Sequence, residues 1–172
     1  MNEKNNQSQT FVYAIYIMTT PEKLWQALTD GDFSANYWFG FRVKSDWKTG
    51  SPIYVRNADF LEGKGNLEGK VIACDPPRRL TYTFTRPADP LAAQRKGPSQ
   101  VTYEITPVGP MVKLTLTHEN LLPQDLEKQT NTLRGINNGW PAILSSLKSL
   151  LETGQPLSFE TLLAQFEPQP AK

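Results

Sequence analysis

Residues 137–154 read NNGWPAILSSLKSLLETG, and this stretch decides the fold. At about 100° per residue, its large apolar side chains fall within an arc of roughly 120°, and the serines and charged residues occupy the rest of the circle. The pattern predicts an amphipathic helix over about 138–153, ended by Gly154 and Pro156, with Pro141 tolerated in its first turn. Such a helix has to cover an apolar surface, which is either a filled core or a cavity. The apolar side chains are Trp140, Ile143, Leu144, Leu147, Leu150 and Leu151.

Upstream of this helix the apolar pattern has a period of two, which is typical of strands with one buried face. In MVKLTLTHEN, residues 111–120, Leu114, Leu116 and His118 share one face, and threonines, a lysine and a glutamate share the other. A sheet of this kind needs its apolar side covered, and the helix over 138–153 is the only long amphipathic element in the sequence. We therefore predict an α+β fold in which that helix lies across an antiparallel sheet of about six to seven strands. Other strands are expected at 11–18, 41–47, 52–58, 80–85 and 100–107, and Gly63, Gly65 and Gly69 indicate a turn and a bulged strand that runs to about Cys74.

The first third of the chain predicts a strand followed by two short helices. FVYAIYIM, residues 11–18, is almost wholly apolar and indicates a strand buried on both faces. Two signals predict a helix over 21–29. Thr20 can cap it through its side-chain oxygen, and Pro21 suits the first helical position. GDFSANYWFG, residues 31–40, indicates a second short helix or turn.

The chain is expected to hold a single domain over 11–155, between a disordered N-terminus (1–10) and a C-terminal tail (156–172). In the tail, apolar residues recur at the spacing of a short amphipathic helix. That helix either folds back on its own domain or docks on a second subunit of a homodimer, because isolated helices this short are marginal in water. The residues concerned are Phe159, Leu162, Leu163 and Phe166.

Composition excludes several classes of function. Lysine plus arginine number 18 and aspartate plus glutamate 17, so the net charge of +1 gives no reason to expect nucleic acid or a membrane surface as partner. No apolar run approaches the roughly 18 residues of a membrane span, and the polar N-terminus lacks the apolar core of a secretory signal. One cysteine excludes an intrachain disulfide and fits a cytoplasmic location, and with a single histidine it makes a metal site improbable. No cofactor motif or catalytic nucleophile motif is present.

Four segments carry a resemblance to a known family. TTPEKLWQALTD (19–30), YWFG (37–40), LTLTHENL (114–121) and GWPAILSSLKSLLETG (139–154) resemble bacterial SRPBCC proteins of the Hsp90-ATPase-activator-like family. The similarity covers roughly residues 10–155, and the order of elements agrees.

This resemblance implies the START-like helix-grip fold, in which a curved antiparallel sheet grips a long C-terminal helix around a hydrophobic cavity. Relatives in the wider superfamily bind lipids, steroids, plant hormones or polyketides, and a few are cyclases or hydroxylase components. The eukaryotic activators carry a further N-terminal domain that 172 residues leave no room for. A chaperone is therefore the second expected partner, after a small hydrophobic molecule.

His118 is the candidate polar group of the covered face. It is either a hydrogen-bonded core residue, which is the commoner case, or a polar contact that orients a mostly apolar ligand at one end of a cavity. Its ordinary pKa would also allow acid–base chemistry, but no catalytic partner is identifiable. Tyr82, Phe84 and Tyr103 also face inward. Because a buried phenol needs a hydrogen-bond partner, they favour a cavity for an amphipathic molecule over a solid core.

The leading hypothesis is that the protein binds or carries a small hydrophobic or amphipathic ligand without covalent chemistry. The alternatives are a protein-interaction module that modulates an Hsp90-type chaperone ATPase, and a cyclase-like or hydrolase-like enzyme using His118. No catalytic or metal-binding residue is assigned. The ligand-binding candidates are Trp38, as gate or core residue, with Phe41, Val55, Tyr82, Phe84, Tyr103, Leu116, His118, Trp140, Leu144 and Leu147. A basic group is interpreted as a solvated loop rim: Arg78, Arg79, Arg86, Arg95 and Lys96.

Overall fold

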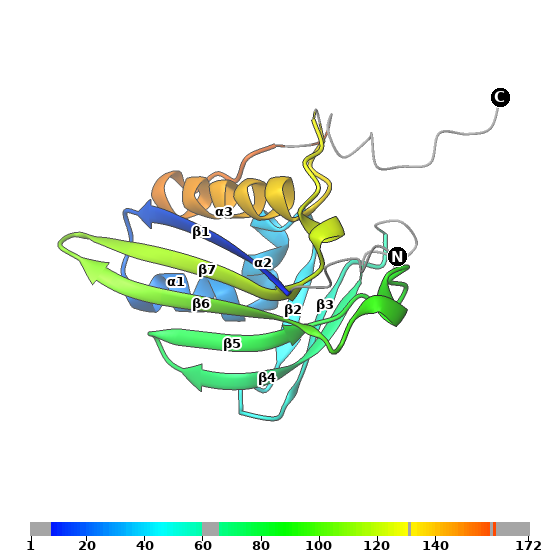
Figure 1. Cartoon of the computed structure of the whole chain (residues 1–172). Helices are drawn as coiled ribbons and strands as arrows, with labels where there is room; N and C mark the ends of the chain where they lie inside the picture. Colours follow the sequence, from blue (N-terminus) through cyan, green and yellow to red (C-terminus); the bar gives the residue numbers. More distant parts are fainter. Residues whose placement is uncertain (1–7, 60–65, 131, 159, 161–172) are drawn as a thin grey trace.

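The computed structural model describes residues 8–59, 66–130, 132–158 and 160. Seven strands form one antiparallel sheet in the order β1-β7-β6-β5-β4-β3-β2. The α+β prediction is confirmed, with two short helices after the first strand and the long helix last (Figure 1). The elements are β1 (Gln9–Ile17), α1 (Pro21–Thr29), α2 (Gly31–Tyr37), β2 (Arg42–Ser45), β3 (Pro52–Arg56), β4 (Leu67–Asp75), β5 (Arg79–Phe84), η2 (Ala92–Gln94), β6 (Ser99–Val108), β7 (Met111–Leu121), η3 (Pro123–Leu126) and α3 (Ile136–Thr153).

Helix α3 buries the apolar stripe that the sequence indicates. Trp140, Ile143, Leu144 and Leu147 are all buried in the hydrophobic core. The helix begins at Ile136, two residues earlier than expected. Pro141 therefore lies in the second turn rather than the first, where its missing N–H leaves one turn without its usual bond.

The serines of α3 hold the chain that follows the helix. Ser149 donates to the carbonyl of Gln155 (2.7 Å), and Ser146 accepts from the amide of Leu157 (3.2 Å). Residues 155–157 therefore run back over α3, which explains a polar band beside the apolar stripe. The amphipathic helix expected in the tail falls on residues outside those described, apart from Glu160, as does most of the expected disordered N-terminus.

Strand β1 corrects the prediction of a strand buried on both faces. Its residues alternate between inner and outer positions: Val12 and Tyr16 are 59% and 48% exposed, as is Met18 just after the strand at 53%. The reason is that the core lies on one face of the sheet only, so β1 alternates in burial as the inner strand β7 does. Strand β2 also ends sooner than expected, at Ser45, and Trp47 lies beyond it with a positive φ of 55°.

The other sheet edge, along β2, is closed by helix α2. Ser34 is fully buried, and its hydroxyl oxygen accepts from the amide of Val43 (2.9 Å). The same hydroxyl lies within hydrogen-bond distance of the carbonyls of Phe41 and Gly31. A backbone edge that would otherwise be open is thus paired by a side chain. Among the described residues no helix is both long and apolar enough to cross a membrane.

Candidate functional site

Six of the predicted site residues form one cluster of rings between the sheet and α3. The ring centroids of Phe84 and His118 are 5.2 Å apart, and those of Trp38 and Trp140 are 5.5 Å apart. Phe84, Tyr82 and Tyr103 link these pairs at 5.8–6.3 Å, the distances at which aromatic side chains contact. We call Trp38, Tyr82, Phe84, Tyr103, His118 and Trp140 the ring cluster.

The other five candidates belong to the same core without joining the ring contacts. All five side chains are buried and pack in one continuous hydrophobic cluster with Trp38 and Trp140. The structure therefore brings the whole predicted set together on the covered side of the sheet, and their part in ligand binding stays a prediction. They are Phe41, Val55, Leu116, Leu144 and Leu147.

His118 is held by a hydrogen bond at each ring nitrogen. The indole N–H of Trp140 donates to Nδ1 (3.0 Å), and Nε2 lies 2.9 Å from the hydroxyl oxygen of Ser99. Because that hydroxyl donates to the carbonyl of Phe84 (2.8 Å), it can only accept from the imidazole. Nε2 therefore carries the proton, and Nδ1 carries the lone pair.

These contacts keep the imidazole neutral. Burial lowers the pKa of His118 from 6.5 to about 4, because the charged form would lose its hydration, and the side chain is only 2% exposed. Protonated Nδ1 would also face the N–H of Trp140, donor against donor. An imidazole with both nitrogens engaged is suited to positioning Trp140 rather than to accepting a proton from a substrate at neutral pH.

Two buried phenols meet in the ring cluster. The hydroxyl oxygens of Tyr82 and Tyr103 are 3.4 Å apart, and only one of their two protons can lie between them. No acceptor among the described residues receives the other proton. Burial raises the pKa of both phenols, so both are protonated at neutral pH. Tyr37, a third buried phenol, differs because it donates to the carbonyl of Ala27 (2.9 Å).

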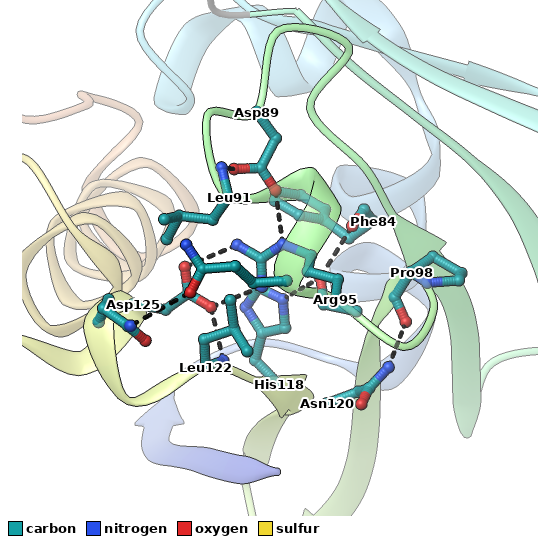
Figure 2. Close-up of polar contacts among 12 residues, drawn as sticks. Phe84, Asp89, Leu91, Arg95, Pro98, His118, Asn120, Leu122 and Asp125 are labelled. Carbon is teal, nitrogen blue, oxygen red and sulfur yellow. Dashed lines mark hydrogen bonds and ion pairs between the residues drawn. The ribbon is translucent and has the colours of Figure 1, made fainter. Parts of the chain in front are cut away.

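An ion-pair cluster covers the His118 end of the ring cluster (Figure 2). Arg95 donates through both terminal nitrogens to Asp125 in η3, each at 2.7 Å, and through Nε to Asp89. We call these three residues the clasp. The prediction that Arg95 belongs to a solvated loop rim is wrong, because its side chain is only 17% exposed. Nothing local distinguishes it from Arg86 or Lys96, because its partner Asp125 lies thirty residues away.

The clasp is held in its charged state by mutual contact. The hydrogen bonds that Arg95 donates to Asp125 and Asp89 raise the pKa of Arg95 above its ordinary value, although burial lowers it. Burial raises the pKa of Asp125, but the hydrogen bonds from Arg95 and from the amide of Leu122 outweigh it and hold that pKa below the ordinary value. A pocket of about 80 Å³ lies beside the clasp, lined by Arg95, Asn120 and Leu122 among others.

A larger open groove of about 840 Å³ lies elsewhere, on the outer side of β2 and β3, and we call it the outer groove. None of the eleven predicted residues lines it. Its basic residues are partly neutralised, since Arg42 pairs with Asp32 and Arg56 with Glu68. It is lined by Ala35, Gly40, Arg42, Lys44, Ser45, Asp46, Pro52, Tyr54, Arg56, Asn57, Ala58 and Asp59. No group of three or more potential metal ligands occurs within the described ranges.

Comparison with known proteins gives one family. The family model described as "Activator of Hsp90 ATPase homolog 1-like protein" matches residues 18–152. A search of curated proteins found no match. Among solved structures, protein MLL2253 from Mesorhizobium loti is 28% identical, with a TM-score of 0.65 over 83% of this chain and 96% of that one.

Two further structures share the fold at lower identity. The Aha1 dimer from Colwellia psychrerythraea is 23% identical, with a TM-score of 0.64 over 85% of this chain and 98% of that one. PFC0360w, described as an HSP90 activator from Plasmodium falciparum, is 21% identical, with a TM-score of 0.61 over 83% of this chain and 95% of that one.

Proposed function

The chain belongs to the Activator of Hsp90 ATPase homolog 1-like family, and from that premise we propose that it binds a small amphipathic molecule between the sheet and α3. The molecule presents an apolar body to the ring cluster and one hydrogen-bond acceptor, such as a carbonyl oxygen, to the phenol pair. The protein acts as a carrier without covalent chemistry. Its single cysteine, Cys74, is free and fits the reducing cytoplasm as its location.

The observation that carries this proposal is the uncommitted proton of the phenol pair. Buried polar groups are almost always hydrogen-bonded, because an unpaired buried donor costs about 1–3 kcal/mol. The polar atoms at the His118 end of the ring cluster are committed: His118 at both nitrogens, and Trp140 through its indole N–H. A ligand acceptor placed at Tyr82 and Tyr103 would satisfy the remaining donor.

The clasp supplies a route of entry. Asp89 and Arg95 lie in the loop between β5 and β6, and Asp125 lies in η3, so opening the clasp breaks no bond of the sheet (Figure 2). The rings are in contact across the cluster, and a ligand therefore has to part them as it enters. A site closed by loops is the common arrangement for binding a molecule that must also be released.

Thermal shift measurements with fatty acids, sterols and aromatic polyketides test the proposal. A ligand present at 100 times its Kd adds about 2.7 kcal/mol to the stability of the folded state, which corresponds to roughly 5–10 °C for a domain of this size. No shift from any class, together with a crystal structure in which the ring cluster stays closed and empty, would contradict it.

Removing the phenol donors separates the polar contact from the apolar one. In Tyr82→Phe/Tyr103→Phe we expect about 10-fold weaker binding of a carbonyl-containing ligand, since its buried acceptor loses its donor, and unchanged binding of the matched hydrocarbon. Tyr37→Phe is the control, because that phenol is equally buried but its donor is committed to Ala27. Equal losses in the two variants would argue against the phenol pair.

A second candidate is a module that binds an Hsp90-type chaperone and alters its ATPase rate. The family match favours it, and the outer groove offers an accessible surface carrying both charges. The ATPase rate of the chaperone should change on addition of the protein, and Lys44→Glu in the groove should reverse that change. Unchanged turnover with the wild-type protein would eliminate this candidate.

A further inference from the structure

The two edges of the sheet are closed to different extents. The β2 edge is paired by Ser34 of α2. On β1, only the C-terminal half is closed: Lys148 donates to the carbonyl of Tyr16 (2.8 Å), and Glu152 accepts from the amide of Met18 (2.8 Å). In Figure 1, α3 lies close to β1 at the end where both finish and separates from it toward Gln9. None of the described residues therefore closes the N-terminal half of the β1 edge.

The register identifies the open backbone groups. In an antiparallel strand, successive residues direct their N–H and C=O to opposite sides. Since Tyr16 and Met18 direct theirs away from β7, the other even-numbered residues do the same. Thr10, Val12 and Ala14 thus present unpaired backbone groups, and no described residue pairs with them.

The side chains of β1 do nothing to protect this edge. Natural proteins blunt open edges with lysine, proline or inward charges, because an open strand pairs with other chains. Residues 9–18, QTFVYAIYIM, contain no charge and no proline. The outer face carries Val12 and Tyr16, exposed at 59% and 48%, and on the inner face Phe11 and Tyr13 are only partly buried.

We propose that the open half of β1 is the docking surface for a second copy of this chain, whose β1 pairs with it antiparallel about a two-fold axis at Val12. Of the symmetric registers, only the one with its axis at Val12 pairs all three outward residues. Val12 lies opposite Val12 of the partner subunit, and Thr10 lies opposite Ala14 of the partner subunit. Lys148 ends the pairing beyond Ala14, because it already occupies the carbonyl of Tyr16.

This register also brings aromatic side chains together. Phe11 falls opposite Tyr13 of the partner subunit in a pair without backbone hydrogen bonds, where Cα atoms lie about 4.5 Å apart and side-chain contact is closest. Because of the two-fold symmetry, this contact between Phe11 and Tyr13 of the partner subunit occurs twice in the dimer. Both side chains, now only partly buried, would be covered in the assembly.

Residues 155–157, which follow α3, are directed elsewhere. Ser149 and Ser146 hold Gln155 and Leu157 over α3, not beside β1. A second copy is favoured because the edge is complementary to itself. The contact is short and buries less than the roughly 1,200 Å² of a stable complex, so the dimer is weak, with a Kd on the order of 10 µM.

Cysteine crosslinking tests the register. In a Cys74→Ser background, Val12→Cys places two thiols face to face at a Cα separation of about 5.5 Å, within disulfide range. Thr10→Cys is the matched control, since its thiols would lie four residues apart along the strands. We expect oxidation to link the Val12→Cys protein at least 10-fold faster. Equal rates, or no crosslink in either variant, would overturn the proposal.

A backbone variant tests the hydrogen bonds. Val12→Pro removes an N–H that points away from β7, so the bonds between β1 and β7 survive, and proline is tolerated at such edge positions. In sedimentation analysis of the full chain we expect wild type and Val12→Thr to dimerise and Val12→Pro to remain monomeric with its circular dichroism unchanged. A wild-type chain that stays monomeric to about 1 mM would refute the dimer. A monomer in which the Val12 amide is protected from exchange would refute it too, by revealing another occupant of the edge.

Discussion

At the residue scale, the protonation state and orientation of buried His118 depend on hydrogen-bond partners that are distant in sequence. His118 receives the indole N–H of Trp140, 22 residues away, and contacts Ser99, 19 residues away. Each hydrogen bond has an ordinary length, but together they allow only the neutral imidazole of His118 with its proton on Nε2. The titration of this one side chain should therefore be visible in the stability of the whole protein.

Stability should fall as the pH drops from 7 to 4.5. The pKa of His118 is about 4 in the folded state and about 6.5 when unfolded, so in this interval the unfolded chain binds more protons and gains stability. The expected loss is about 2–3 kcal/mol. The lowered pKa values of Asp89 and Asp125 act only at lower pH, near the ordinary carboxyl range. Urea denaturation at several pH values measures the slope, and His118→Gln should flatten it; an equal slope in that variant would place the effect elsewhere.

Gly69 in β4 should not tolerate a side chain. A Cβ there would lie 1.8 Å from the carbonyl oxygen of Thr83, a backbone atom of β5 that cannot move aside freely. We expect Gly69→Ala to cost more than about 2 kcal/mol in the free energy of unfolding. Gly139→Ala is the contrast, because its Cβ would meet only ordinary contacts in α3 and should add about 0.5–1 kcal/mol. Equal thermal stability of the two variants would be inconsistent with this packing.

At the scale of elements, the helices do more than cover the sheet. Helix α2 closes the β2 edge through Ser34, and α3 closes half of the β1 edge through Lys148 and Glu152. Each helix thus contributes a polar side chain to a strand in addition to its apolar face. The edges are consequently unequal: among the described residues, the first half of β1 has a longer run of outward backbone groups without a partner.

Ser34→Ala should therefore destabilise the protein although it removes a single oxygen. The amide of Val43 would lose its acceptor in a fully buried position, at an expected cost of about 1–3 kcal/mol. Ser149→Ala, on the exposed side of α3, should change the free energy of unfolding by less than about 0.5 kcal/mol. Guanidinium denaturation of both variants makes the comparison, and equal effects would mean that α2 does not support the edge through this hydroxyl.

At the scale of the whole molecule, one ion-pair cluster joins segments that the sheet does not connect. The clasp ties the loop between β5 and β6 to η3 at the end of the ring cluster. Because Arg95 and Asp125 are largely shielded from water, their attraction is screened less than that of surface pairs. Opening of this end is thus set by one arginine.

Arg95→Met should lower the free energy of unfolding by about 2–4 kcal/mol, since two partly buried carboxylates would lose their partner. It should also speed the release of a bound hydrophobic fluorophore in stopped-flow measurements. Arg78→Met is the matched control, because its pair with Asp75 is exposed, and neither stability nor release should change. If Arg95→Met releases the fluorophore faster but melts at the wild-type temperature, the predicted contribution of the clasp to stability is wrong, and the clasp controls only ligand release.

The sequence by itself determined the elements whose patterns are local. The period of α3, the alternation of β5, β6 and β7, and the caps of α1 depend on residues a few positions apart, so they were predictable. The inward direction of His118, Tyr82 and Tyr103 followed from the same alternation. The membership of most of the eleven candidates in one core is therefore a consequence of periodicity, while Trp38 caps α2 and contact of the set with a ligand stays a prediction.

Only the tertiary structure decided which partners meet. β1 was expected to be buried on both faces because its sequence is apolar throughout, but the core formed with distant segments such as α3 covers only one face of the sheet. Likewise, the local sequence predicts that Arg95 is exposed to solvent, and only the fold places Asp125 beside it. The spacing of apolar side chains shows which face of a helix or strand is apolar. Whether that face is buried, and which polar side chains pair with its neighbours, depends on contacts between segments that are distant in sequence, and no local pattern determines these contacts.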